Sequence, residues 1–302
     1  MVSELRALRA LAARIGADAM QVQGPGGNVS LKTGGRLHVK ASGTWLRDAA
    51  DRDVLASLDR EAVLSAYREG RGASAPPGTP RPSIETSFHA LIPHAVVLHT
   101  HSVHALAHLV APEGREAAAA KLAGLGAVLV PYAMPGRPLT AAIEAAGAGA
   151  PVHLLVSHGL IASGPDVAAA AALLADVERR LALPARPPPA APTDAPAGWL
   201  RMAPDLAAPR ARRIAARGAY WPDHVVFLGG GIGTDGALAR IDAGGGLLRE
   251  GAPEAAGAML RCLGDVLARL PDGWSPEPLP PAEAARLADW EAEAFRRKVG
   301  RP

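Results

Sequence analysis

The sequence RPSIETSFHALIPHAVVLHTHSVHALAH occupies residues 81–108 and contains six of the ten histidines of the chain, together with the carboxylate of Glu85. Residues 95–102 (AVVLHTHS) form a short apolar run with β-branched residues, which predicts a buried strand. Near its end lie His99 and His101. Alternate residues of a strand point to the same face, roughly 6–7 Å apart, so these two imidazoles can both bind one metal ion.

A metal site of this kind needs a third protein ligand, because catalytic zinc usually has three and leaves one position for water or substrate. Residues 153–161 (HLLVSHGLI) form a second strand-like run, and we predict that His158 supplies this ligand. The alternative for the H-x-H pair alone is two histidines on a solvated or hydrogen-bonded face. The upstream carboxylate of Glu85 and the histidine at a second strand end favour the metal site.

Composition indicates a soluble globular protein. The 302 residues are 49% hydrophobic and 20% charged, and the single cysteine, Cys262, excludes both an intrachain disulfide and a cysteine-based zinc site. A net charge of +3 with scattered arginines and 4% aromatic residues does not favour nucleic-acid binding. The longest uncharged apolar stretch, residues 145–165, contains Pro151 and several glycines, so we expect no membrane span and no secretion signal, and hence a cytoplasmic protein.

The order of the expected elements indicates a mixed α/β fold, with a sheet covered by helices. We expect helices over residues 1–15, 53–70, 86–93, 104–109, 138–147 and 166–183, and strands over residues 28–32, 36–40, 126–131 and 152–157. Gly34 and Gly35 form the turn between the first two strands. Ser83 is an N-cap candidate for the helix at 86–93, which would place Glu85 in its first turn.

Two small-residue turns should lie at the same end of this first hairpin. They contain Gly27 and Asn28, and Ser42 and Gly43. Their backbone N–H groups, with the Asn28 amide and the Ser42 hydroxyl, could bind a phosphate or a carboxylate. The alternative is that the glycines only form turns.

A tract rich in proline and alanine, LPARPPPAAPTDAPAG at residues 183–198, predicts a boundary between a domain at 1–185 and an extension at 186–302. We expect the extension to be a smaller α+β region. Its predicted elements are helices at 208–218, 253–270 and 281–298 and strands at 224–228 and 237–242. Residues 231–236 (GIGTDG) fit G-x-G-x-x-G only formally, because no helix is predicted to open at these glycines.

Four blocks carry a resemblance to a known family: GPGGNVSLK (24–32), VKASGTWL (39–46), PSIET with HTHS, and VSHGLIASG (156–164). They resemble the class II, metal-dependent aldolase and adducin head-domain family, in order and in rough spacing, across residues 1–185. The aldolase half of bifunctional rhamnulose-phosphate aldolase/short-chain dehydrogenase proteins is more closely similar, because it shares a P-D-H-V element like that at residues 222–225.

The resemblance implies a three-layer α/β/α fold and a divalent ion, Zn²⁺ or another such as Mn²⁺ or Co²⁺. It implies that His99, His101 and His158 bind the ion and that Glu85 is the acid/base. The residues implied around a substrate phosphate are Gly27, Asn28, Ser42, Gly43 and Ser83. Ile84 stands where the sugar-phosphate aldolases commonly have a serine, so one hydroxyl that could bind the phosphate is lost.

The implied activity is that of a lyase on a small molecule, a ketose 1-phosphate or related hydroxyketone. It would cleave this substrate by a retro-aldol reaction through an enediolate that the metal stabilises. Decarboxylases, epimerases and dehydratases of the superfamily use similar chemistry, and a non-catalytic adducin-like binding module is the alternative from another class. The resemblance also implies a homotetramer with sites at subunit interfaces, so the extension could cover a neighbour's site. His224 could then approach the metal as a ligand or an acid, or simply be a strand residue satisfied by the backbone.

Overall fold

The computed structural model describes residues 2–190, 192, 194–229, 232, 238–290 and 294. The elements of the first part of the chain are α1 (Val2–Ala17), β1 (Asn28–Thr33), β2 (Arg36–Lys40), η1 (Leu46–Ala50), β3 (Leu55–Asp59), α2 (Arg60–Arg68), α3 (Thr86–Leu91), β4 (Val96–Thr100), α4 (Val103–Leu109), α5 (Pro112–Lys121), β5 (Ala127–Val130), α6 (Arg137–Gly147), β6 (Val152–Leu155), β7 (Gly159–Gly164) and α7 (Val167–Leu181). Those that follow are β8 (Trp199–Arg201), η2 (Pro204–Ala207), α8 (Pro209–Ala215), α9 (Pro222–Leu228), β9 (Ala239–Asp242), β10 (Gly245–Arg249), α10 (Glu254–Arg269) and α11 (Pro281–Asp289).

A seven-stranded sheet organises the first part, in the order β3-β2-β1-β4-β7-β6-β5. Its neighbouring strands are antiparallel except for the parallel pair β5 and β6. Strand β4 lies in the middle, and all five of its residues are buried. The predicted strand that carries His99 is therefore confirmed, and it is the central strand of the sheet.

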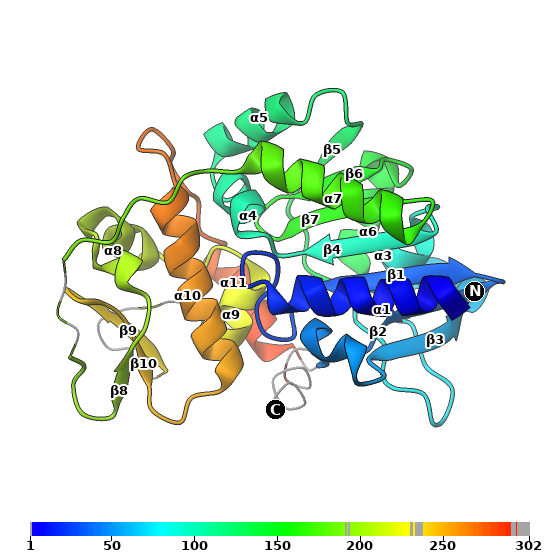
Figure 1. Ribbon diagram of the computed structural model, residues 1–302, viewed down its shortest axis with the longest axis horizontal. Helices are drawn as coiled ribbons and strands as arrows, with labels where there is room; N and C mark the ends of the chain where they lie inside the picture. Colours follow the sequence, from blue (N-terminus) through cyan, green and yellow to red (C-terminus); the bar gives the residue numbers. More distant parts are fainter. Residues whose placement is uncertain are drawn as a thin grey trace.

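Helices cover both faces of this sheet (Figure 1). On one face α1, α4 and α7 enclose a hydrophobic cluster that includes Leu98 of β4. On the other face α3 and α6 pack over Val97, and α2 packs over the β2 and β3 end of the sheet. The alternation along β4 sends Val97 and His99 to the α3 side. The predicted α/β/α layering is confirmed.

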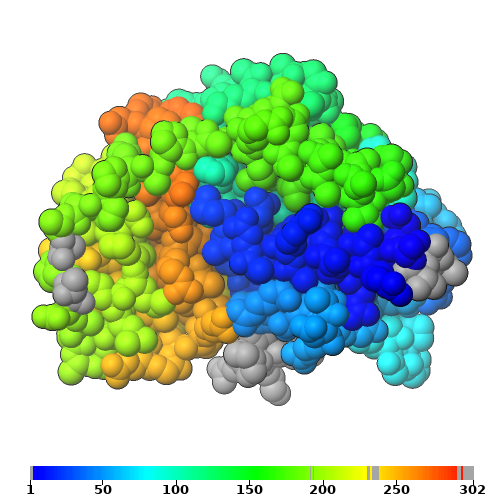
Figure 2. Space-filling view, viewed as in Figure 1, coloured from blue at the N-terminus to red at the C-terminus, as the bar shows by residue number. Residues whose placement is uncertain are grey.

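The C-terminal region is an α+β unit with a three-stranded sheet in the order β8-β10-β9. It packs on the first part of the chain through a shared cluster, in which Val103 and Leu106 of α4 join α9 and α10. At the edge of this contact the Arg47 guanidinium makes a bidentate ion pair with Glu254, at 2.6 and 2.9 Å. Figure 2 shows the orange atoms of α10 directly against the blue N-terminal segment.

Several predicted elements differ from the structure. The helix predicted over 53–70 is strand β3 followed by helix α2, because the Asp59 carboxylate caps α2 by accepting a hydrogen bond from the Ala62 N–H. The strand predicted over 224–228 is helix α9, which starts at Pro222, a favourable first helical residue. Strand β7 was not predicted as a separate strand, and Glu85 is the N-cap of α3 rather than a residue of its first turn.

Some predictions fall largely outside the described residues. Of the glycine motif at 231–236, only Ile232 is described. The helix predicted over 281–298 is described as far as Asp289 as α11, and most residues beyond Asp289 lie outside the described part. The helices predicted over 1–15, 138–147, 166–183 and 253–270 are confirmed with small shifts at their ends. In the described part of the chain, every helix is too short or too polar to cross a bilayer.

Candidate metal centre and substrate pocket

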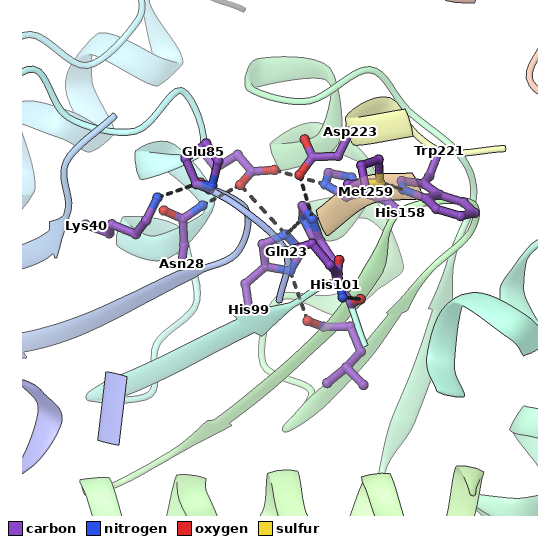
Figure 3. Close-up of polar contacts among 12 residues, drawn as sticks. Gln23, Asn28, Lys40, Glu85, His99, His101, His158, Trp221, Asp223 and Met259 are labelled. Carbon is purple, nitrogen blue, oxygen red and sulfur yellow. Dashed lines mark hydrogen bonds and ion pairs between the residues drawn. The ribbon is translucent and has the colours of Figure 1, made fainter. Parts of the chain in front are cut away.

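Three histidines converge at the end of strand β4 (Figure 3). His99 is the fourth residue of β4, and His101 follows the last. Their Nε2 atoms lie 3.1 Å apart, as expected for residues on the same face of a strand. Both side chains are buried.

The third histidine, His158, comes from the turn between β6 and β7. This turn, residues 156–158, places Ser157 in the left-handed region at φ 52° and directs His158 toward β4. Its ring centroid lies 5.1 Å from that of His99 and 5.2 Å from that of His101. The three predicted metal ligands therefore meet at one point, although His158 belongs to a hairpin turn and not to a strand end.

The donor set of this cluster fits a divalent metal ion. One nitrogen from each of the three rings lies within 4.8 Å of the other two. Two imidazole nitrogens on one tetrahedral zinc ion lie roughly 3.3–3.4 Å apart, close to the 3.1 Å between His99 and His101. Facing lone pairs at this distance repel each other unless a cation or a proton lies between them. Three neutral nitrogen ligands suit zinc and the neighbouring divalent transition metals.

Hydrogen bonds outside the cluster fix which nitrogen of each ring faces it. His99 Nδ1 lies 2.9 Å from the Leu160 carbonyl oxygen, which can only accept, so Nδ1 carries the proton and Nε2 keeps its lone pair. His101 Nδ1 lies 2.9 Å from Asp223 Oδ2. Burial lowers the pKa of His99 to about 3, so this ring is neutral at neutral pH and able to bind a cation.

Glu85 lies beside the histidines at the start of α3. Its Oε1 is 3.3 Å from His158 Nε2, and its Oε2 is 3.7 Å from His99 Nε2. Burial alone would raise the pKa of this carboxyl, but the histidine rings around it, His99 and His158 foremost, with a hydrogen bond from His158, lower its pKa well below 4.5. The carboxylate can therefore donate electrons to a metal or accept a proton from a bound molecule.

The glycine turn before β1 contributes the amide of Asn28. Its Nδ2 donates a 2.6 Å hydrogen bond to Glu85 Oε2. Gly27, the preceding residue, has φ +62°, and a Cβ there would lie 2.9 Å from the His99 carbonyl oxygen. The turn therefore approaches β4 so closely that a side chain at residue 27 would collide with its backbone.

A pocket opens beside Glu85, His101 and His158. The five residues predicted around a substrate phosphate all line it: Gly27, Asn28, Ser42, Gly43 and Ser83. Ser42 and Ser83 are brought together because their N–H groups bond to the Arg81 and Lys40 carbonyl oxygens, respectively. The two glycine turns and the segment before α3 therefore form one wall.

The pocket also contains residues that sequence reasoning missed or only partly considered. The buried Lys40 ammonium lines it and donates a 2.9 Å hydrogen bond to the Pro25 carbonyl oxygen. Ile84 lines the pocket as well and offers it no hydroxyl. Pro222 and Asp223 reach the same wall from the C-terminal region. The sequence offers a signal for Lys40, because this lysine lies within the VKASG block. It offers none for Asp223, because only tertiary packing brings that residue to the pocket.

His224 is not part of the histidine cluster. The prediction that it lies on a strand is wrong. It lies on helix α9, fully buried, with its ring beside that of Trp221 at 5.2 Å between centroids. Its Nδ1 accepts a hydrogen bond from the Tyr220 N–H at 3.3 Å. The alternative of a histidine satisfied by the backbone is therefore correct for Nδ1, and its neighbour Asp223 contacts the metal cluster instead.

Several solved structures are similar to this chain. The N-terminal class II aldolase domain of a conserved Thermoplasma acidophilum protein is 25% identical, with a TM-score of 0.51 over 58% of this chain and 90% of that one. A sugar-phosphate aldolase from Thermotoga maritima is 18% identical, with a TM-score of 0.46 over 60% and 94%. An aldolase II superfamily protein from Pseudomonas syringae is also 18% identical, with a TM-score of 0.47 over 59% and 72%. No curated protein sequence matches the chain.

The sequence profile of one family covers residues 7–183, more than half of the chain. The matched range runs from α1 to the coil after α7 and includes the three histidines, Glu85 and both glycine turns. It ends before the C-terminal region. The chain belongs to the class II aldolase and adducin N-terminal domain family.

Proposed function

We propose that this protein is a metal-dependent lyase that cleaves a carbon–carbon bond of a ketose 1-phosphate or a related hydroxyketone. The observation that carries the proposal is the position of Glu85: a buried carboxylate 3.3 Å from His158 and 3.7 Å from His99, in the lining of a pocket. An ion held by the three histidines would supply Lewis-acid stabilisation of negative charge on substrate oxygens. A carboxylate at this position suits proton transfer at the neighbouring carbon.

Glu85 and Asn28 have different roles in the proposed reaction. In the cleavage direction the ionised Glu85 would take up the proton released by the substrate hydroxyl whose carbon becomes the aldehyde, and would deliver a proton to the carbon that keeps the bonding electron pair. In the reverse direction it would remove the proton from that carbon. Asn28 orients the Glu85 carboxylate through the 2.6 Å hydrogen bond. The enclosed position of the two side chains limits competition from water.

An anionic group on the substrate fits the far side of the pocket. Lys40 supplies a positive charge, and Ser42 and Ser83 supply hydroxyls beside the backbone of Gly27 and Gly43. The lysine offsets the hydroxyl that Ile84 lacks, so a phosphate remains the group we propose. Within the family, the P-D-H-V sequence motif at residues 222–225 supports a relationship to the aldolase half of the bifunctional rhamnulose-phosphate aldolase/short-chain dehydrogenase proteins. Assembly into a homotetramer stays a prediction.

The test is an assay of aldehyde and dihydroxyacetone phosphate released from a panel of ketose 1-phosphates by protein loaded with Zn²⁺, Co²⁺ or Mn²⁺. We expect release by the wild type and a fall in kcat of about 10²–10⁴-fold for Glu85→Gln, the usual contribution of a general acid/base. Glu61→Gln, which changes an exposed glutamate on α2, is the matched control and should leave kcat unchanged.

Two results would contradict the proposal. Undiminished turnover by Glu85→Gln would remove the acid/base role. Loaded protein that epimerises, dehydrates or decarboxylates a substrate without releasing an aldehyde would assign the site to another reaction of the superfamily.

A further inference from the structure

The contact between His101 and Asp223 joins two parts of the chain that the family profile separates. His101 lies within residues 7–183, and Asp223 lies in the C-terminal region beyond them. The Nδ1 and Oδ2 atoms are 2.9 Å apart, and both residues are almost completely buried, at 3% and 1% exposure. The negative charge of a buried carboxylate this close to a histidine nitrogen favours a proton on that nitrogen.

The two edges of the His101 ring have different partners. Nε2 faces His99 Nε2 across 3.1 Å, whereas Nδ1 faces Asp223. Among the described residues, the cluster suited to a metal contains the three histidines and not Asp223. Asp223 therefore lies behind His101, where a carboxylate orients a metal-binding imidazole and increases its basicity.

Helix α9 holds Asp223 in place. The helix begins at Pro222, and all seven of its residues are buried. Just before it, the Trp221 Nε1–H points at the Met259 sulfur of α10 at 3.2 Å. The Asp223 side chain is thus carried by a packed helix, and its position does not depend on a loop.

The glycine turn is shaped to leave room for this pair. A Cβ at Gly26 would lie 2.8 Å from Asp223 Oδ2 and 3.0 Å from His101 Nδ1. Any other residue at this position would therefore push on both atoms of the contact. Gly26 is therefore close to a contact between the C-terminal region and one of the three histidines.

We propose that Asp223 is a positioning residue that holds His101 with its Nε2 free to bind the metal, so that the C-terminal region takes part in forming the metal site. The inference rests on the metal site of the proposed function. It implies that this family member completes the surroundings of its metal ligands with a segment of its own chain that follows the family domain.

The experiment measures the affinity of the full-length protein for Co²⁺ by competition with a chromophoric chelator, together with the visible spectrum of the bound ion. In Asp223→Asn the amide can also donate to Nδ1 and favour the wrong tautomer, so we expect the Kd to rise about 10–100-fold. The spectrum of the saturated variant should keep the same coordination number. Gly26→Ala, which disturbs the contact without altering the carboxylate, should weaken binding in the same direction.

Glu277→Gln is the matched control. Glu277 also links the C-terminal region to the first part of the chain, by a 3.0 Å ion pair with Arg115, but on an exposed surface. This variant should bind Co²⁺ like the wild type, and thermal unfolding without metal identifies variants that are misfolded. Gly26→Ala keeps the test valid if Asp223→Asn is misfolded.

Three outcomes would overturn the inference in distinguishable ways. An unchanged Kd in both Asp223→Asn and Gly26→Ala would show that the contact does not support metal binding. Loss of one ligand from the Co²⁺ spectrum would show that Asp223 binds the ion directly. A wild-type protein without Co²⁺ affinity would refute the metal site itself, and with it the proposed function.

Discussion

The amide of Asn28 and the carboxylate of Glu85 are joined by a 2.6 Å hydrogen bond between two buried side chains. Asn28 opens strand β1 and is paired with His99 across the sheet, whereas Glu85 is the residue directly before helix α3. The bond therefore ties the glycine turn, the central strand and the helix that carries the carboxylate at one point. Glu85 has few ways to move while this bond is intact.

Asn28→Ala tests the importance of this bond for the reaction and for stability. The Glu85 carboxylate would lose a strong donor while remaining buried, which costs about 1–3 kcal/mol of unfolding free energy. We expect kcat to fall about 10–100-fold because the carboxylate is no longer held in one orientation. Kinetics and urea unfolding measure the two effects, with Ser74→Ala, at an exposed position in the loop before α3, as a neutral control. Unchanged kcat would show that Glu85 does not depend on Asn28.

Gly27→Ala tests the close approach of the glycine turn to β4. Gly27 has φ +62°, and a Cβ there would lie 2.5 Å from Val22 Cγ1 and 2.9 Å from the His99 carbonyl oxygen. Gly34 has a similar φ of +55° but no atom within 4 Å of its Cβ position. Gly34→Ala should therefore cost only the conformational strain, about 1–2 kcal/mol. We expect Gly27→Ala to cost more in urea unfolding, and equal losses would contradict the predicted collision.

Part of the candidate site could be predicted from sequence because its geometry is local. His99 and His101 face the same way by the alternation of a strand. His158, Glu85 and Asn28 come from segments far apart along the chain, and the four family blocks relate them to this strand. In the sheet, His158 ends the turn between β6 and β7, and it is β7 that lies beside β4.

The contribution of the C-terminal region could not be predicted in the same way. Residues 222–228 are all buried in the structure, and a short apolar run buried on every side has no periodicity that separates a helix from a strand. Predicted as a strand, this segment drew attention to His224. As a helix, it directs Asp223 to His101, and only the packing of α9 on α10 and α4 determines that contact.

Glu178 on α7 should make stability depend on pH. Burial raises its pKa to about 7, whereas an unfolded glutamate titrates near about 4.3. Because the folded form holds the proton more tightly, the protein is stabilised below the unfolded pKa and loses that stability as the pH rises to about 7. The loss is about 2–3 kcal/mol between pH 5 and pH 8. Urea unfolding of Glu178→Gln should lack this decrease, while the exposed Glu116→Gln should retain it. A parallel pH dependence in wild type and Glu178→Gln would refute the assignment.

A bound metal ion should stabilise the folded protein through the three histidines. A ligand that binds only the folded state adds about 2.7 kcal/mol at a hundredfold excess over Kd, so Zn²⁺ should raise the Tm and a chelator should lower it again. His99→Ala removes one of three ligands and should lose most of this shift. His94→Ala changes a histidine that bonds to the Ser163 hydroxyl away from the cluster, and it should keep the full shift. Differential scanning calorimetry with and without Zn²⁺ distinguishes the variants. Equal shifts in His99→Ala and His94→Ala would mean that the ion binds elsewhere, because the central strand offers no substitute for the His99 Nε2.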